Sequence, residues 1–337
     1  MTRTLRPRWP LALALSLLAG LAFADAVQVD ERIPAYKPIQ GVSGSLNSKG
    51  SDTMNELMTF WFEGFKKMYP AVTTEMEGKG SGTAPPALIE GSATFGPMSR
   101  TMKDKEIDDF EKKFGYKPTS IPTSIDMLAV FVHKDNPIQG LTLQQLDAVF
   151  SKTRKSGAEK DAVTWGDLGL TGEWASQPIS LYGRNSASGT YAYFKEHALA
   201  KGDYKDSVKE QAGSSAVVQS VAKDKYAIGY SGIGFVTADV RAVPIAKDAK
   251  SKFIEARPEN AYTGEYPMAR FLYVYVNKKP GTDLDPLRRE FLRFVLSKPG
   301  QEEVVKAGYF PLTAKLIADG LKKIGVDVGT LEAGAPR

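Results

Sequence analysis

Four short segments of this chain carry residues that could hold an oxyanion. Each combines small residues with one or more hydroxyls and precedes a stretch with a helical pattern; they span residues 50–53, 78–83, 96–100 and 183–190. Such a loop directs unpaired backbone N–H groups, together with the positive end of the helix dipole, at one point. The four loops are therefore candidate parts of one anion site.

The fourth loop carries the most informative pattern. Arg184 follows a strand-like stretch and stands four residues before Ser188, Gly189 and Thr190, where a helix is expected to begin. The forked guanidinium of arginine matches two oxygens of a tetrahedral oxyanion, whereas lysine would act only as a point charge. Folded back over the helix start, Arg184 could hold an anion against the first amides of that helix.

The other three loops add hydroxyls and a second cation, and simpler interpretations exist for two of them. Ser, Asp and Thr cap helices well, so the first loop alone could be an N-cap. The glycine-rich second loop could be a flexible turn. The third loop places a hydroxyl beside a guanidinium. The candidates from these loops are Ser51, Asp52, Thr53, Ser81, Ser99 and Arg100.

Alternating strand-like and helix-like stretches must position these loops. Residues 42–46 have a strand pattern and are followed by a glycine-containing turn and an amphipathic helix over residues 54–69. This order is the repeating unit of an open, doubly wound α/β sheet. A chain of 337 residues usually divides into two domains. Further helices are expected over residues 103–114, 143–150, 191–201, 215–223 and 285–296.

Two apolar stretches, residues 125–133 and 270–277, are predicted to link two α/β lobes as crossover strands. Each ends in a polar segment that contains proline, and an inserted lobe requires the chain to leave the first lobe and return. This interpretation assigns residues 25–127 and 274–337 to lobe 1 and residues 128–273 to lobe 2. Periodicity alone fits equally well with two buried strands of one sheet.

The first 24 residues have the pattern of a secretory signal peptide. Arg3, Arg6 and Arg8 precede a short apolar run that ends in an Ala-Phe-Ala triplet. Its removal lowers the formal net charge from +5 to +2, so the chain has no strong basic character and no basic stripe for nucleic acid. With no cysteine for a disulfide or a lipid anchor, the mature chain is expected to be a soluble periplasmic protein. A retained N-terminal anchor is the alternative.

The residue types disfavour most catalytic chemistries. There is no cysteine and there are two isolated histidines, His133 and His197, so a zinc site or cofactor is not expected. The glycine spacing around Ser231 does not match a nucleophile elbow. The fourth loop lacks the lysine that precedes the hydroxyl residue in a P-loop. Binding is the simplest function left, and phosphatase activity would require a metal.

Taken together, the four loops and the two crossover strands resemble the periplasmic phosphate-binding proteins of the PstS family, which serve ABC phosphate importers. The resemblance covers nearly the whole mature chain, and the motifs arrive in the family's order. It implies a type II periplasmic binding fold, in which two lobes close on one phosphate, and a monomer that docks on permease membrane subunits. By position, the residues implied to bind phosphate are Ser51, Asp52, Thr53, Ser81, Ser99, Arg100, Arg184, Ser188, Gly189 and Thr190.

One departure from the family concerns selectivity. Well-known members carry on the third loop an Asp that accepts a hydrogen bond from a phosphate O–H and so rejects fully ionised sulfate. Residues 98–101 hold no carboxylate here, and our hypothesis is that Asp52 takes this role. The alternative for Asp52 is a helix cap. Alternatives for the chain are a relative of the same fold that binds another oxyanion, or a secreted sensor or adhesin.

Overall fold

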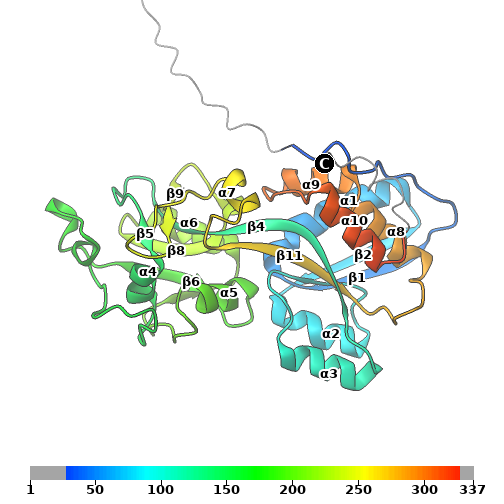
Figure 1. The fold of residues 1–337 in the computed structure, drawn as a ribbon, viewed down its shortest axis with the longest axis horizontal. Coiled ribbons are helices and arrows are strands. Elements are labelled where there is room, and N and C mark those ends of the chain that lie inside the picture. The colour runs from blue at the N-terminus through cyan, green and yellow to red at the C-terminus, as the bar shows by residue number, and fades with distance from the viewer. Residues whose placement is uncertain (1–27, 327–337) are drawn as a thin grey trace, which may run out of the picture.

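A computed structural model of the chain describes residues 28–326, so the predicted signal peptide lies outside the described range. Two groups of helices and strands are joined by two long strands that run side by side between them (Figure 1). The group that holds α1 to α3 and α8 to α10 is called lobe 1, and the group that holds α4 to α7 is called lobe 2. No helix in residues 28–326 is long and apolar enough to cross a membrane.

Lobe 1 forms around α1 (Asn55–Met68), an amphipathic helix that follows strand β1 (Gly44–Gly50). Its apolar residues recur at every fourth position and are buried against α8 and α9; the indole of Trp61 donates to the carbonyl of Gly300 at 2.8 Å. Besides β1 and α1, lobe 1 contains η1 (Asp52–Met54), β2 (Val72–Gly78), η2 (Ser81–Thr83), α2 (Ala84–Glu90), β3 (Gly96–Met98), α3 (Asp104–Phe114), α8 (Pro286–Val295), α9 (Lys298–Lys306) and α10 (Ala314–Lys323).

Lobe 2 packs around a stack of Phe194 and Tyr230, whose rings lie 4.0 Å apart and nearly parallel, and Phe150 meets both rings edge-on. This stack lies directly behind the strand that leads to the fourth loop, since the hydroxyl of Tyr230 accepts from the amide of Arg184 at 3.2 Å. Lobe 2 contains β5 (Leu141–Thr142), α4 (Leu143–Phe150), η3 (Trp165–Leu168), η4 (Gly172–Trp174), β6 (Ser180–Arg184), α5 (Gly189–His197), β7 (Lys209–Gln211), α6 (Ser214–Lys223), β8 (Ala227–Gly232), η5 (Ile233–Phe235), β9 (Val240–Ala242), β10 (Ile245–Ala246) and α7 (Pro258–Tyr262).

The two linking strands are β4 (Thr119–His133) and β11 (Ala269–Val276), and they pair antiparallel. The first part of β4 pairs with β11 as far as Met127, and from Leu128 onward it pairs with β8 of lobe 2. A single sheet in the order β3-β11-β4-β8-β6-β7 therefore runs through both lobes. The sequence allowed two interpretations of these stretches. The strands link the two lobes, as crossover strands do, and they are also neighbours in one sheet.

Most predicted helices form close to their expected limits, and the differences have local causes. The helix expected over residues 191–201 starts at Gly189, because Ser188 caps it, and ends at His197. Ala200 and Lys201 have positive φ angles and cannot continue a helix. The first strand begins at Gly44 and extends to Gly50, because its register with β2 continues to Gly78.

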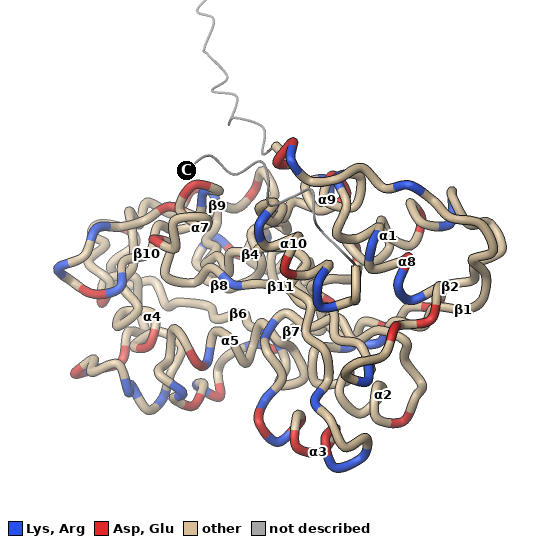
Figure 2. Tube along the Cα trace, turned by 45° about the vertical axis from the view of Figure 1, so that its right-hand side comes forward, with Lys and Arg blue, Asp and Glu red and all other residues tan. Residues whose placement is uncertain are grey.

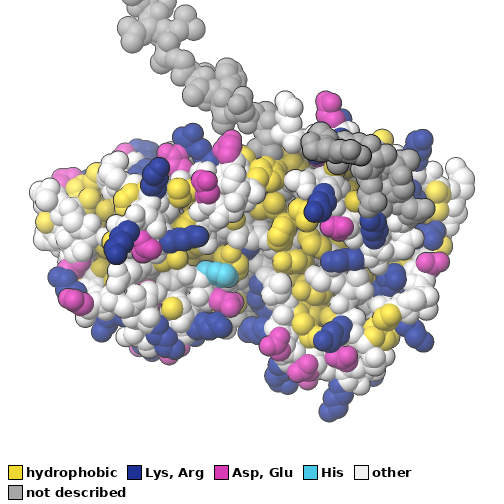
Figure 3. Space-filling model, in the orientation of Figure 1, with side chains coloured by type: hydrophobic (Ala, Val, Ile, Leu, Met, Phe, Trp, Pro, Cys, Tyr) yellow, Lys and Arg dark blue, Asp and Glu magenta, His cyan; other side chains and the backbone are white. Residues whose placement is uncertain are grey.

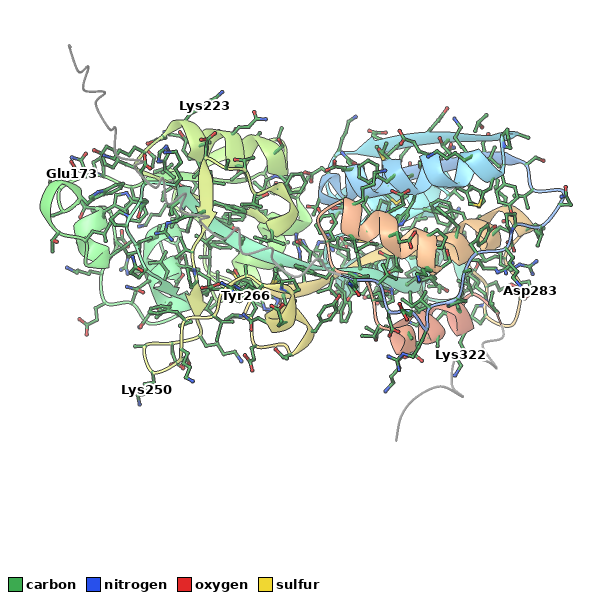
Figure 4. The ribbon with its side chains drawn as sticks, turned by 90° about the horizontal axis from the view of Figure 1, so that it is seen from above. Glu173, Lys223, Lys250, Tyr266, Asp283 and Lys322 are labelled. Carbon is green, nitrogen blue, oxygen red and sulfur yellow. The ribbon has the colours of Figure 1, made fainter. Side chains whose placement is uncertain are left out.

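Positions of Lys and Arg are interspersed with positions of Asp and Glu along the chain trace in both lobes, as expected from the composition (Figure 2). A view from above places Tyr266 beside the linking strands, with Glu173, Lys223 and Lys250 on lobe 2 and Asp283 on lobe 1 (Figure 4). Tyr266 is buried and donates to the carbonyl of Leu128 at 3.0 Å. It is therefore a packing residue of the linking strands and offers no surface to a partner.

Candidate anion-binding site

The four loops predicted from the sequence meet between the lobes. The first two begin at the carboxyl ends of β1 and β2, the third contains β3 and extends past its carboxyl end, and the fourth begins at the carboxyl end of β6 in lobe 2. β1 and β2 pair in parallel, and a parallel bridge between Ser48 and Phe95 brings the start of the third loop to the same edge. Parallel neighbours deliver their carboxyl ends together, and ligands of open α/β sheets bind at such edges.

Three buried serines, one from each loop of lobe 1, form a hydroxyl cluster. Ser51 Oγ donates to Ser99 Oγ at 3.1 Å, and the hydroxyls of Ser81 and Ser99 lie 3.2 Å apart. The amide of Ser99 donates to Ser81 Oγ at 3.0 Å, which ties the third loop to the second. Each hydroxyl can rotate to donate its proton elsewhere, so the cluster can exchange internal hydrogen bonds for bonds to an anion.

The fourth loop places the start of α5 directly over this cluster. Ser188 is the N-cap of α5, and its hydroxyl accepts from the amides of Thr190 at 3.1 Å and Tyr191 at 3.4 Å. A Cβ atom at Gly189 would overlap the hydroxyls of Ser81 and Ser99. Only glycine allows the backbone of lobe 2 to come this close to the serines of lobe 1.

Contacts between loops of opposite lobes show that the cleft is closed at this point. The amide of Gly82 donates to the carbonyl of Ala187 at 3.2 Å, and the hydroxyls of Thr53 and Thr190 are 3.0 Å apart. Gly80 has a φ of +118° and lies so near the same carbonyl that a Cβ atom would overlap it. The four loops therefore form one enclosed polar site, to which both lobes contribute.

An ion pair crosses the cleft between Asp52 and Arg184. Arg184 Nη2 lies 2.6 Å from Asp52 Oδ1; the side chain of Arg184 is 1% exposed and that of Asp52 is 10% exposed. The contact with Asp52 is electrostatic, because the N–H groups of Arg184 donate to other acceptors: Ser214 Oγ at 2.8 Å and the carbonyl of Ala212 at 3.2 Å. Asp52 Oδ1 accepts no hydrogen bond within residues 28–326, so it keeps acceptor capacity. In the structure, Asp52 pairs with the opposite lobe and does not cap its own helix.

Arg100 does not join the cluster, although its neighbour Ser99 does. Its guanidinium forms two hydrogen bonds, of 2.8 and 2.7 Å, with the carboxylate of Glu106 on α3. Glu106 also accepts from the amide of Lys103 at 2.8 Å, so Arg100 completes the capping of α3. In the structure the guanidinium of Arg100 therefore pairs with Glu106 in the first turn of α3 and not with the serine cluster, and its role beside the anion stays a prediction.

Sequence reasoning missed a second buried ion pair at the site. Arg270 on β11 and Asp126 on β4 lie opposite each other, with Arg270 Nη2 2.7 Å from Asp126 Oδ2. Arg270 Nη2 also donates to Thr190 Oγ1 at 3.0 Å. The sequence contained a signal for this pair. The apolar stretch of residues 125–133 has one charged residue, Asp126, and the stretch of residues 270–277 has one of opposite sign, Arg270.

Tyr309 was also missed; its hydroxyl donates to the carbonyl of Thr53 at 2.7 Å and so fixes the first loop. Burial raises the pKa of Tyr309 well above its usual range, so it stays a donor. We expect Tyr309→Phe to lower the free energy of unfolding by about 1–3 kcal/mol, since a buried carbonyl loses its donor. Denaturant unfolding measures this.

Tyr262→Phe is the matched control for that measurement. Tyr262 also donates to a backbone carbonyl, that of Pro311 at 2.9 Å, but its side chain is 42% exposed and water can replace the bond. The change should cost less than about 0.5 kcal/mol. Equal effects for the two variants would contradict the role given to Tyr309.

A groove with a volume of about 910 Å³ lies between the lobes next to this site. Its walls come from the segment before α3, from α5 and from β11, and include Arg100, Tyr191, Tyr193, Arg270 and Tyr273. Figure 3 shows the surface hollowed between the two lobes. Because Arg270 belongs both to the groove and to the enclosed site, the groove borders the site on the side of the linking strands.

The two histidines lie outside the hydroxyl cluster. His133 ends β4, and His197 ends α5, where its ring stacks on Tyr193 with centroids 4.0 Å apart. Burial lowers the pKa of His197, which favours its neutral form. Within residues 28–326, no group of three or more His, Asp or Glu side chains is arranged to hold a metal ion.

Comparison with known proteins agrees with this arrangement. Residues 37–299 match the family described as PBP superfamily domain. The phosphate-binding protein PstS of Pseudomonas aeruginosa is 56% identical over 309 residues, which cover 91% of this chain and 96% of that protein. The PstS of Staphylococcus haemolyticus is 31% identical, with 84% and 86% of the two chains covered.

Solved structures give the same result for the fold. A putative phosphate ABC transporter substrate-binding protein from Clostridium perfringens, solved with bound phosphate, superposes with a TM-score of 0.68 at 25% identity over 80% of this chain and all of that one. An ABC-type phosphate transport receptor from Vibrio cholerae gives a TM-score of 0.63 at 20% identity over 79% of this chain and all of that one. The predicted two-lobed fold of type II periplasmic binding proteins is confirmed, and the chain belongs to the PstS family of phosphate-binding proteins.

Proposed function

We propose that this chain captures one inorganic phosphate between its lobes and delivers it to the membrane subunits of an ABC phosphate importer. The observation that carries the proposal is the meeting of four hydroxyl- and amide-rich loops, three from lobe 1 and one from lobe 2, at one enclosed point. The names of the related proteins, which describe phosphate binding and phosphate transport, support the choice of anion.

The proposed phosphate ligands are the loop residues that meet in the cleft. They are Ser51, Asp52, Thr53, Ser81, Ser99, Arg184, Ser188, Gly189 and Thr190. Phosphate is strongly hydrated, so an enclosed site must replace that water with many donors, and each hydrogen bond to a charged group contributes about 1.5–3 kcal/mol. The first amides of a helix have no intrahelical acceptor. In α5 the amides of Thr190 and Tyr191 donate to Ser188 Oγ, so binding to the anion would replace these capping bonds.

The formal charges at the site nearly cancel without a ligand. Arg184 is paired with Asp52, and Arg270 is paired with Asp126. The bound anion is therefore held mainly by oriented amides and hydroxyls, with the arginines fixed in place by their carboxylate partners. A site of this kind discriminates between anions by the number and direction of their protons more than by total charge.

Asp52 is the proposed determinant of selectivity between phosphate and sulfate. A carboxylate can only accept, so it holds a ligand that has a proton to donate and repels one that lacks it. We expect Asp52→Asn to increase sulfate affinity relative to phosphate by about tenfold or more, the value of one charge-assisted hydrogen bond. Calorimetric titration with both anions measures the ratio.

Asp126→Asn is the matched control for selectivity, because it also removes a buried carboxylate from an arginine but at the linking strands. The ratio of phosphate to sulfate affinity should stay within about threefold in this variant, a difference of less than 1 kcal/mol. An unchanged ratio in Asp52→Asn would show that selectivity comes from elsewhere.

Closure follows from the way in which the lobes share the ligand. Loops of both lobes reach the anion together only in the closed arrangement, so phosphate favours the closed state over the open one. The linking strands β4 and β11 are the proposed hinge, with lobe 1 made of residues 25–127 and 274–337 and lobe 2 of residues 128–273. The closed form is what the permease would recognise.

The remaining parts of the proposal concern location and assembly. The chain is proposed to act as a monomer in the periplasm after cleavage of residues 1–24, without a cofactor and without catalysis. Mass measurement of the exported chain tests the cleavage, and incubation with a generic phosphomonoester tests for phosphatase activity.

Isothermal titration of the purified protein with phosphate, sulfate, arsenate and a phosphonate tests the proposed function. We expect one phosphate per chain and the tightest binding for phosphate, with arsenate next because it is tetrahedral and carries a proton. Binding of another oxyanion in preference to phosphate would favour the alternative, a relative of the same fold with a different ligand.

A further inference from the structure

The buried pair of Arg270 and Asp126 lies at the point where the lobes are joined. The two residues are cross-strand neighbours on β11 and β4, and Asp126 lies two positions before Leu128, where β4 begins to pair with β8. Arg270 donates to Asp126 Oδ2 through Nε at 2.9 Å and Nη2 at 2.7 Å. The side chains are 2% and 0% exposed, so the pair is fixed inside the proposed hinge.

Arg270 also connects the hinge to the anion loops. Its Nη2 donates to Thr190 Oγ1 at 3.0 Å, and Thr190 Oγ1 lies 3.0 Å from Thr53 Oγ1 of the opposite lobe. A continuous chain of polar contacts thus runs from Asp126 through Arg270 and Thr190 to Thr53. It joins the linking strands, the start of α5 and the first loop of lobe 1.

The chemistry of these groups determines where the proton of Thr190 points. A guanidinium can only donate, so Thr190 Oγ1 must accept from Arg270. The single proton of that hydroxyl then points away from Arg270, toward the side where Thr53 Oγ1 or an anion in the cleft can accept it. A charged donor on one side of a hydroxyl also polarises it and strengthens its own donation on the other side.

The guanidinium is held in this orientation from a second direction. Its centre lies 5.3 Å from the ring centroid of Tyr193, and the hydroxyl of Tyr193 donates to the carbonyl of Ala269 at 2.6 Å. The ring, the carboxylate and the strand register therefore fix Arg270 before any ligand arrives. A preorganised donor adds affinity because no side-chain entropy is lost when the ligand binds.

We propose that Arg270 is a positioning residue for phosphate binding, which acts by fixing the hydroxyl of Thr190 as a donor toward the anion and by tying that hydroxyl to the hinge. The inference rests on the proposed function and adds to it a residue outside the four loops. It implies that the hinge strands contribute to ligand affinity without touching the ligand.

A double-mutant cycle on Arg270 and Thr190 tests this relation, with phosphate affinity measured by calorimetry. Arg270→Gln and Thr190→Val are each expected to weaken phosphate binding by about tenfold or more. Since Arg270 acts through Thr190, the double variant should bind about as weakly as the weaker single variant. If the fold-loss of affinity in the double variant equalled the product of the two single losses, Arg270 would act independently of Thr190, and the proposal would be overturned.

Two further variants separate positioning from folding. Removal of one member of a buried ion pair can destabilise a fold, so Asp126→Asn with Arg270→Gln provides a charge-neutral pair that must also bind phosphate about tenfold more weakly. Arg241→Gln is the matched control: Arg241 lies in lobe 2, donates to the carbonyls of Asn136 and Ile138, and should leave phosphate affinity unchanged. Wild-type affinity in the charge-neutral pair would overturn the proposal.

Amide hydrogen exchange in the phosphate-free protein distinguishes failure of this inference from failure of the proposed function. If Arg270 anchors Thr190, the first turn of α5 should exchange faster in Arg270→Gln than in the wild type, whichever anion the site takes. Unchanged exchange there would contradict the anchoring role. If the wild type binds a different oxyanion, the affinities of the four proteins in the double-mutant cycle are measured with that anion. The double variant should again bind about as weakly as the weaker of the two single variants.

Discussion

Replacing Arg184 with glutamine is expected to lower phosphate affinity by about 30- to 5000-fold, which corresponds to the 2–5 kcal/mol expected when one member of a buried charge pair is removed. The change removes the guanidinium from the cleft and leaves Asp52 without its cation, so an added anion would face an uncompensated carboxylate. Titration of the purified variant with phosphate measures the loss.

Two variants serve as references for that result. Arg100→Gln also removes an arginine near the cleft, but Arg100 is bound to Glu106 on α3, so we expect phosphate affinity within about threefold of the wild type. Arg184→Lys keeps the charge and loses the fork, and should fall between the wild type and Arg184→Gln. If Arg100→Gln weakened binding as much as Arg184→Gln, our assignment of the two arginines would be wrong.

Replacing Gly189 with alanine is expected to prevent full closure and to lower phosphate affinity by at least about a hundredfold, since several hydrogen bonds from lobe 2 would be lost together. The added methyl group would occupy the space of the hydroxyls of Ser81 and Ser99. Alanine is a good residue for the start of α5, so each lobe should fold normally. Small-angle scattering with saturating phosphate should show a more open particle than the wild type.

Gly82→Ala is the matched control for closure. Gly82 belongs to the loop that faces α5, and a Cβ atom there would lie 3.6 Å from the carbonyl of Ala187, an ordinary contact. This variant should close and bind phosphate like the wild type. Equal affinity of the Gly189 and Gly82 variants would mean that the lobes do not need to approach as closely as the structure shows.

The sequence was sufficient for the features that depend on neighbouring residues. Cap residues, glycines and the apolar periodicity of α1 lie close together in the chain, so the loops and most helices could be predicted from them. The same holds for Asp52, because its position at a helix start made it a candidate. That it pairs with Arg184 of the other lobe could not be read from local pattern, since the two are 132 positions apart.

The parts that were missed depend on contacts between distant segments. Arg270 and Asp126 become neighbours only because β4 and β11 pair, and Tyr309 reaches Thr53 from the far end of the chain. Arg100 was assigned to the anion because it follows Ser99, but the direction of its side chain depends on Glu106 in the next helix. The positions of α9 and α10 were also not predicted, although both cover lobe 1.

The site as a whole shows why an oxyanion can be bound without an excess of positive charge. Arg184 and Arg270 each have a carboxylate partner, and the remaining donors are the hydroxyls and the start of α5, whose amides Ser188 caps in this structure. Their directions are set by strands that end at one edge and by glycines that allow the lobes to meet. Affinity for the anion then comes from donors whose directions are fixed before the anion binds. An exposed basic patch would not supply such fixed donors.

A crystal structure of the purified protein with bound phosphate tests the central claim most directly. We predict one phosphate enclosed between the lobes, with hydrogen bonds from the serines of lobe 1, from the start of α5 and from Arg184, and with Asp52 accepting from the phosphate. Phosphate bound only in the neighbouring groove, without contact to Arg184 or to the start of α5, would contradict the account.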